Sequence, residues 1–147
     1  MDTLSKFGIW MNRIVIMAVS ILFSTIGIKN ILHPIQNTEQ SGIILNSATA
    51  LSVVRVSMGA FPLAFAVILL AGLLIRRQLF GAILSVFIII VITTIVRIAS
   101  LQIDGHSDFG LKVLKPEIMI TIFSTIGLYL ELRRKKMESS AGYSANT

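Results

Sequence analysis

Residues 50–74, with the sequence ALSVVRVSMGAFPLAFAVILLAGLL, decide the fold class of this chain. The stretch is mostly apolar and carries a single charged residue, Arg55. About 20 apolar residues in a helix that rises about 1.5 Å per residue cross about 30 Å of hydrocarbon, so the stretch predicts a membrane-spanning helix. An arginine at the centre of a span is unfavourable by roughly 2.5–3.5 kcal/mol, so we expect Arg55 to reach a headgroup or a partner.

The composition of the whole chain supports the same class. Of its 147 residues 54% are hydrophobic and 14% are charged, and the mean hydropathy is +0.85. These values indicate an integral membrane protein. The chain has no cysteine, which excludes disulfides, thiol redox chemistry and cysteine-ligated metals. The net charge of +6 comes from basic residues that mostly flank apolar runs, so we expect membrane lipids as partners and no nucleic acid.

Three further apolar runs complete an all-α integral membrane four-helix bundle. The expected spans are residues 10–32, 50–75, 78–103 and 115–132, within one membrane domain at 14–132 that follows a short lead at 1–13. A signal peptide is the alternative for the first run, but no A-x-A cleavage site follows it. We expect the basic tail at 133–147 to be largely disordered.

Local signals mark the expected ends of these spans. Pro34 disfavours helix at His33 and ends the first span, and Asn46 or Ser47 is expected to cap the second. Pro116 is expected in the first turn of the fourth helix, next to Glu117.

The basic residues predict the orientation in the membrane. In a four-span arrangement they gather on one side, as Lys6, Arg13, Arg76, Arg77 and the run at 133–136. The positive-inside rule therefore predicts a multi-pass arrangement in which both termini are cytoplasmic.

Polar and small residues recur at helical spacing in every span, and only a helix bundle satisfies such faces in lipid. We expect an inward charged cluster in the outer half of the bundle, in which Arg97 is the first partner of Glu117. Its members are Arg55, Arg97, Asp104, Glu117 and Asn30. Gly27, Gly59 and Pro62 are expected at helix contacts, and Leu69 is expected to face lipid.

Other interpretations of these polar residues stay open. Arg55 and Arg97 would instead snorkel to the outer headgroups, and Asp104 would cap a loop. His33 and His106 could form a metal site with Asp104 or Asp108. The alternative is that both histidines are solvated in loops, and on this interpretation we predict no metal.

One pentapeptide, FSTIG, occurs at residues 23–27 and again at 123–127. It either marks a duplication or reflects the need for small residues at helix contacts. The flanking residues do not match, which favours the second interpretation.

The order and spacing of these motifs resemble a bacterial family called domain of unknown function 4345. The pattern comprises Gly27 before Pro34, Arg55-x-x-x-Gly59, Arg97 followed by Asp104-Gly105, and Glu117 opening the last helix. The resemblance covers residues 14–132 and implies a small four-span membrane protein, loosely similar to DoxX-like proteins. It also implies a multi-pass protein of the bacterial cytoplasmic (inner) membrane. The family has no established activity, so the resemblance implies only that Arg55, Arg97, Asp104 and Glu117 form a site. His33 is not part of the pattern.

These observations favour a binding or accessory protein with a charged outer pocket and no cofactor. Its expected partner is a small amphiphilic ligand or another membrane protein, and a homo-oligomer is compatible with the sequence. The alternative is a small transporter or channel subunit that acts as an oligomer, although the first span has no deep carboxylate. An enzyme ranks last, because no nucleophile and base are paired within the spans.

Overall fold

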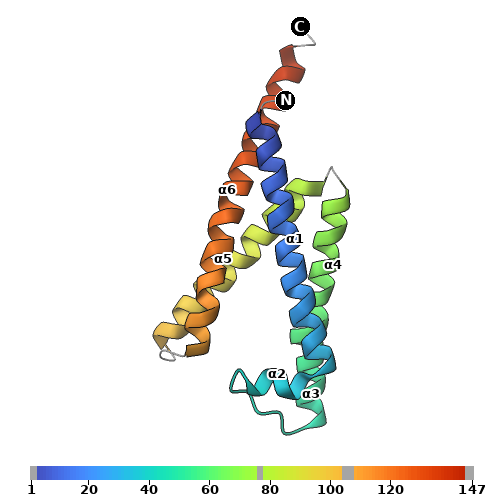
Figure 1. Ribbon diagram of the computed structural model, residues 1–147, viewed down its shortest axis with the longest axis vertical. Coiled ribbons are helices and arrows are strands. Elements are labelled where there is room, and N and C mark those ends of the chain that lie inside the picture. Colours follow the sequence, from blue (N-terminus) through green and yellow to red (C-terminus); the bar gives the residue numbers. More distant parts are fainter. Residues whose placement is uncertain (1–2, 76–77, 104–107, 145–147) are drawn as a thin grey trace. The chain divides into compact units, whose positions relative to one another are not determined.

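The computed structural model describes residues 3–75, 78–103 and 108–144, which contain helices and no strand (Figure 1). Four helical stretches are long and apolar enough to cross a membrane: Lys6–Leu32, Ala48–Leu74, Leu79–Ile103 and Gly110–Met137. The prediction of an all-α protein with four membrane-spanning helices is therefore confirmed.

The chain forms two compact units. The first unit comprises Met1–Val15 and Arg76–Thr147, and the second comprises Ile16–Ile75. The elements in chain order are α1 (Thr3–Leu32), α2 (Pro34–Glu39), α3 (Ala48–Val54), the π-helical turn η1 (Arg55–Ala60), α4 (Phe61–Leu74), α5 (Leu79–Ile103) and α6 (Asp108–Ser144).

The second unit begins with most of α1. This helix ends at Leu32, directly before the His33–Pro34 pair at which the sequence predicts a stop, and Pro34 opens the short helix α2. Ser47 rather than Asn46 caps α3, and its Oγ accepts a hydrogen bond from the Ala50 N–H at 3.1 Å.

The second span is one continuous run of helix with a widened turn in its middle. The Phe61 N–H donates to the carbonyl of Val56, five residues back, where an α-helix would bond four residues back. Pro62 has no N–H, and in a regular helix its ring would clash with the carbonyl of Met58. The wider turn before Pro62 relieves that clash and keeps the helix unbroken.

Two glycines bring α1 and the second span into close contact. A Cβ at Gly27 would lie 2.8 Å from the Gly59 carbonyl oxygen and 2.9 Å from the Leu63 Cβ, and a Cβ at Gly59 would lie 2.7 Å from Ile31 Cγ1. The prediction that Gly59 faces another helix is confirmed. Small residues at this crossing let the two backbones approach, as is common for helices in lipid.

The prediction that Leu69 faces lipid is wrong, because its side chain is completely buried. Pro62, Ala66 and Leu69 follow one another at helical spacings of four and three, so Leu69 shares the face of Ala66, which is also fully buried. The same contact face includes an edge-to-face pair of Phe23 on α1 and Phe65 on α4, with ring centroids 5.4 Å apart.

In the first unit α5 and α6 pack along one another (Figure 1). The predicted bounds of the last helix are wrong at both ends. α6 begins at Asp108, so Pro116 lies inside the helix, and it continues to Ser144, well past the expected end at Leu132. Proline removes one hydrogen bond, to the Lys112 carbonyl, and the good helix formers on both sides sustain the helix around it.

Candidate functional site

The first unit contains the ion pair that the sequence predicts. Arg97, late in α5, donates from Nε to Glu117 Oε2 on α6 at 2.7 Å. The Glu117 side chain is 9% exposed and that of Arg97 26% exposed. The two helices are consecutive and antiparallel, which brings residues on either side of the connecting segment to the same depth. The predicted pairing of Glu117 is therefore confirmed.

A strip of hydroxyl groups continues from this pair along the contact between α5 and α6. The Thr121 hydroxyl donates to the carbonyl of Glu117 at 2.8 Å, and it lies 3.3 Å from the hydroxyl of Thr94. Ser124 is completely buried and donates to the carbonyl of Thr121 at 3.0 Å. The strip is polar and uncharged, and its hydrogen bonds are made within α6 and between α5 and α6.

The other expected members of the charged cluster fall elsewhere. Asp104 lies outside the described residues, as does His106 of the alternative metal site. Arg55 and Asn30 belong to the second unit.

Arg55 borders a groove in the second unit. The groove has a volume of about 360 Å³, and we call it the Arg55 groove; it is lined by Leu32, His33, Pro34, Ile35, Gln36, Leu51 and Arg55. Arg55 is exposed and makes no ion pair with Glu39, which is the one acidic residue in the sequence of this fully described unit. The groove thus combines apolar walls with a guanidinium that no carboxylate of the unit neutralises.

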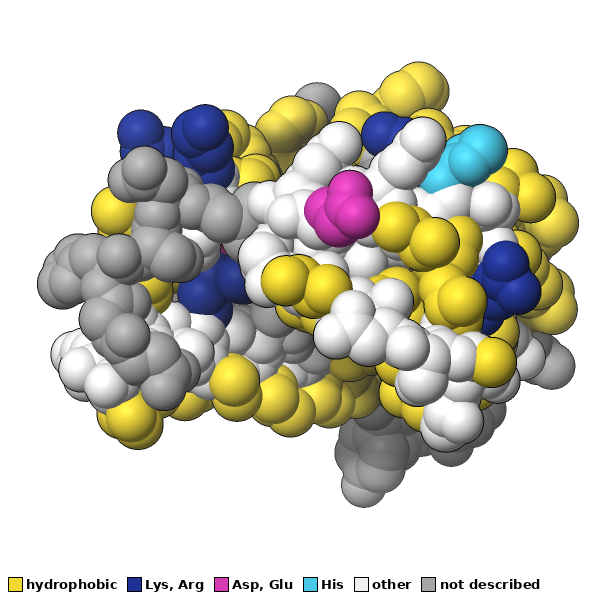
Figure 2. Space-filling view, turned by 90° about the horizontal axis from the view of Figure 1, so that it is seen from below, with side chains coloured by type: hydrophobic (Ala, Val, Ile, Leu, Met, Phe, Trp, Pro, Cys, Tyr) yellow, Lys and Arg dark blue, Asp and Glu magenta, His cyan; other side chains and the backbone are white. Residues whose placement is uncertain are grey.

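The surface around α2 mixes apolar and polar side chains. Figure 2 shows α2 from below, with hydrophobic side chains among polar ones and the backbone. The exposed apolar residues of this segment include Leu32, Ile35 and Ile44. Such a mixture is typical of the boundary between hydrocarbon and headgroups.

Asn30 has a positioning role in this groove. Its side chain is buried, donates from Nδ2 to the Ile26 carbonyl at 3.0 Å, and accepts from Asn37 Nδ2 at 2.8 Å. The bond from Asn37 ties α2 to the end of α1, and α2 supplies Pro34, the first residue of the groove wall on that helix. Asn30 therefore holds the wall in place and does not line the groove itself.

Two buried polar residues of the first unit were missed by the sequence analysis. Asn12 is completely buried and donates from Nδ2 to the Gly127 carbonyl at 3.1 Å. Glu131 is 2% exposed, and Arg134 binds both its oxygens, Nη2 to Oε1 at 2.5 Å and Nε to Oε2 at 3.2 Å. Glu131 was detectable, because it continues the stripe through Glu117 and Ser124 at helical spacing.

The contacts of Gly27 and Gly127 explain the repeated pentapeptide in part. Gly27 meets Gly59 and Leu63 within the second unit, whereas Gly127 meets the Asn12 side chain within the first. Each copy of the motif thus places its glycine at a close helix contact, with different neighbours. This agrees with the interpretation that helix packing selects the small residue.

The comparison with protein families identifies one match. The sequence model of the family described as "Domain of unknown function (DUF4345)" matches residues 11–127, which is most of the chain and includes Arg55, Arg97, Asp104 and Glu117. No curated protein and no solved structure matches the chain. With four helices of membrane-spanning length and this match over most of its residues, the chain belongs to the DUF4345 family.

Proposed function

We propose that this protein is a binding protein of the bacterial cytoplasmic membrane that holds a small amphiphile with an anionic head in the Arg55 groove. In the orientation predicted by the basic flanks both termini are cytoplasmic, and the groove then opens at the outer face of the membrane. The ligand's head pairs with Arg55, and its apolar part lies against Leu51 and Ile35.

The observation that carries this proposal is the charge balance of the groove. A guanidinium beside apolar walls is stabilised by an anion, and the acidic residue of the same unit, Glu39, does not pair with Arg55. The volume of about 360 Å³ lies within the range of small-molecule sites, roughly 300–1,000 Å³. A ligand with one anionic head completes the pairing that the unit lacks.

The backbone at Arg55 supports the same assignment. Arg55 is the first residue of the π-helical turn, and such turns occur frequently at functional sites. In the first unit, by contrast, Arg97 is already paired with Glu117. That pair is neutral as a whole and supplies structure, whereas Arg55 supplies the unneutralised charge.

The test is a titration of the full-length protein in dodecyl maltoside with decyl phosphate, with uncharged decanol as the second probe. We expect decyl phosphate to raise the melting temperature of the wild type and decanol to do so much less. Arg55→Gln should abolish the difference between the probes, and Arg55→Lys should retain part of it.

The matched control is Lys29→Gln, which removes one exposed cation of the same unit that does not line the groove. It should leave the response to decyl phosphate unchanged. An unchanged response in Arg55→Gln, or an equal loss in Lys29→Gln, would show that the groove does not bind the anion.

A further inference from the structure

The wall of the Arg55 groove contains a second nitrogen-bearing side chain, the imidazole of His33. His33 lies directly after α1 and is the N-cap residue of α2, but its side chain makes no capping hydrogen bond. The N-cap position favours short side chains whose oxygen accepts from the first turn of the helix. The imidazole is therefore not used to cap α2, and it is exposed in the groove wall instead.

The backbone of His33 is fixed from both sides. Its N–H donates to the Lys29 carbonyl at 2.8 Å, which continues the bonding of α1, and its carbonyl accepts from the Asn37 N–H at 3.2 Å, which begins α2. Pro34, the next residue, is buried. A wall residue whose backbone is already held requires no ordering of a loop when a ligand binds.

The contacts between α1 and the second span bring Arg55 level with His33. The two helices run antiparallel, and a Cβ at Gly59 would lie 2.7 Å from Ile31 Cγ1. Arg55 precedes Gly59 by about one helical turn, so it lies level with the residues directly after α1, of which His33 is the first. The guanidinium and the imidazole therefore come from different elements and line one groove.

We infer that the ligand of the Arg55 groove has a phosphate monoester as its head, held by Arg55 and His33 together. The inference rests on the proposed function and names the chemical class of its anion. A guanidinium binds two oxygens of an anion through parallel hydrogen bonds. A phosphate monoester has a third oxygen that accepts from the imidazole, whereas a guanidinium bound in this way occupies both oxygens of a carboxylate.

The charges of the groove and of this head also match. A phosphate monoester carries a charge of about −1.5 to −2 at pH 7. Arg55 supplies one permanent positive charge, and an imidazole next to an anion is favoured in its protonated, cationic form. The described residues that line the groove include no carboxylate, and Glu39 is not among them. A dianionic head is thus balanced by the two nitrogen-bearing side chains.

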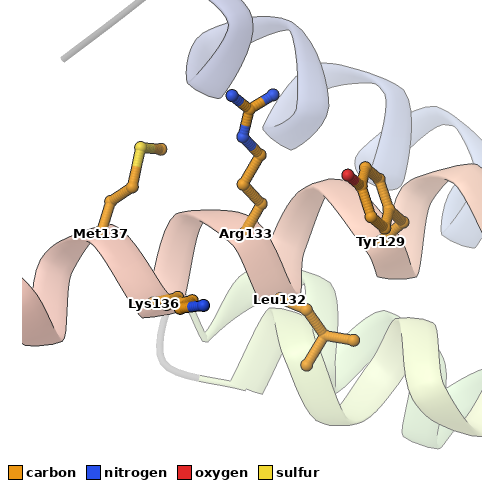
Figure 3. Close-up of a pocket in the computed structure, with 5 residues that line it drawn as sticks. All are labelled: Tyr129, Leu132, Arg133, Lys136 and Met137. Carbon is orange, nitrogen blue, oxygen red and sulfur yellow. The ribbon is translucent and has the colours of Figure 1, made fainter.

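A second groove, in the first unit, lacks this arrangement (Figure 3). It has a volume of about 600 Å³, and its described lining consists of Tyr129, Leu132, Arg133, Lys136 and Met137. All five belong to α6, and Lys136 already has an interaction partner within the protein. The Arg55 groove is smaller, and its two nitrogen-bearing side chains come from two elements, which suits it better to hold a compact head between them.

The experiment measures affinities of the full-length protein in dodecyl maltoside by isothermal titration calorimetry. The probes are decyl phosphate, decanoate and inorganic phosphate. We expect the wild type to bind decyl phosphate about tenfold more tightly than decanoate, because the additional hydrogen bond joins charged groups. Inorganic phosphate should bind much more weakly than decyl phosphate, because it leaves the apolar walls exposed to water.

His33→Asn tests the role of the imidazole, because asparagine is favoured at an N-cap and so preserves α2. We expect this variant to bind decyl phosphate about tenfold more weakly and to change the affinity for decanoate by less than about twofold, so that the preference is lost. Equal losses for both probes would indicate a structural role of His33 and overturn the inference. An unchanged melting temperature without ligand verifies that the variant folds.

Glu39→Gln is the matched control, because it removes a charge from the same segment at an exposed position that does not line the groove. We expect the preference for decyl phosphate over decanoate to change by less than about twofold, since exposed charges are screened. If Glu39→Gln raised the preference as much as His33→Asn lowers it, a diffuse charge effect would replace the pairing with His33 and overturn the inference.

The remaining outcomes separate this inference from the proposed function. Equal affinities of the wild type for decyl phosphate and decanoate, both weakened in Arg55→Gln, would overturn the phosphate head and leave the anion site in place. Affinities that are the same in the wild type and in Arg55→Gln would overturn the anion site itself. Binding of inorganic phosphate as tight as that of decyl phosphate would identify a free-anion site and overturn the amphiphile.

Discussion

Removing either partner of the Arg97–Glu117 pair should destabilise the protein far more than removing both. Arg97→Ala leaves the Glu117 carboxylate, whose side chain is 9% exposed, without its cation. Replacing both residues with methionine leaves no buried charge and retains most of the side-chain volume. The comparison therefore separates the penalty of an unpaired charge from the net contribution of the pair.

The structure indicates the size of each effect. Breaking a fully buried pair from one side is destabilising by about 3–5 kcal/mol. The Arg97 side chain is 26% exposed, so we expect about 2–4 kcal/mol for Arg97→Ala. Arg97→Lys keeps the charge but loses the Nε hydrogen bond to Oε2, so about 1–2 kcal/mol is expected. The double change Arg97→Met with Glu117→Met should lie within about 1 kcal/mol of the wild type.

The measurement is the free energy of unfolding in mixed micelles as the fraction of sodium dodecyl sulfate is raised, with helix content followed by circular dichroism. The order of stability should be wild type, double variant, Arg97→Lys and Arg97→Ala. If the double variant is no more stable than Arg97→Ala, the loss does not come from an unpaired carboxylate and the reasoning is refuted.

Three further predictions test the packing and the topology. Gly27→Ala should destabilise by about 1–2 kcal/mol, since its Cβ would meet the Gly59 carbonyl. Gly81→Ala should stabilise slightly, because the space around Gly81 is open. Equal shifts in the melting temperatures of the two variants would contradict the close contact between α1 and the second span. Leu69→Ala should destabilise by roughly 1–3 kcal/mol, and Leu74→Ala by much less, because the Leu74 side chain is 82% exposed. A larger loss of stability in Leu74→Ala than in Leu69→Ala would show that Leu69 faces lipid. Reporter fusions should read cytoplasmic at the C-terminus and external at Asn37, and an external C-terminus would reverse the predicted orientation.

The Arg97–Glu117 pair was predictable, because the depth of each residue in the membrane and the helix periodicity are enough to identify its partner. Arg97 and Glu117 lie at similar distances from the segment that joins their helices, so the antiparallel arrangement predicts their contact. Asn12 was not predictable in this way, because its partner is a backbone carbonyl 115 residues away. Backbone carbonyls are chemically the same at every position, so the sequence does not indicate which carbonyl accepts the hydrogen bond of a buried side-chain amide.

The sequence by itself determined that the chain is all-α, that it has four membrane-spanning helices, and where α1 ends. These properties depend on local chemistry, namely the length of each apolar run and the lack of a proline N–H. The tertiary structure alone decided that Leu69 is buried, that a π-helical turn precedes Pro62, and which cations of the run at 133–136 line a groove. Such properties depend on how each helix is rotated toward its neighbours, and in lipid that rotation is set by close packing and polar contacts, because exposed and buried surfaces are almost equally apolar.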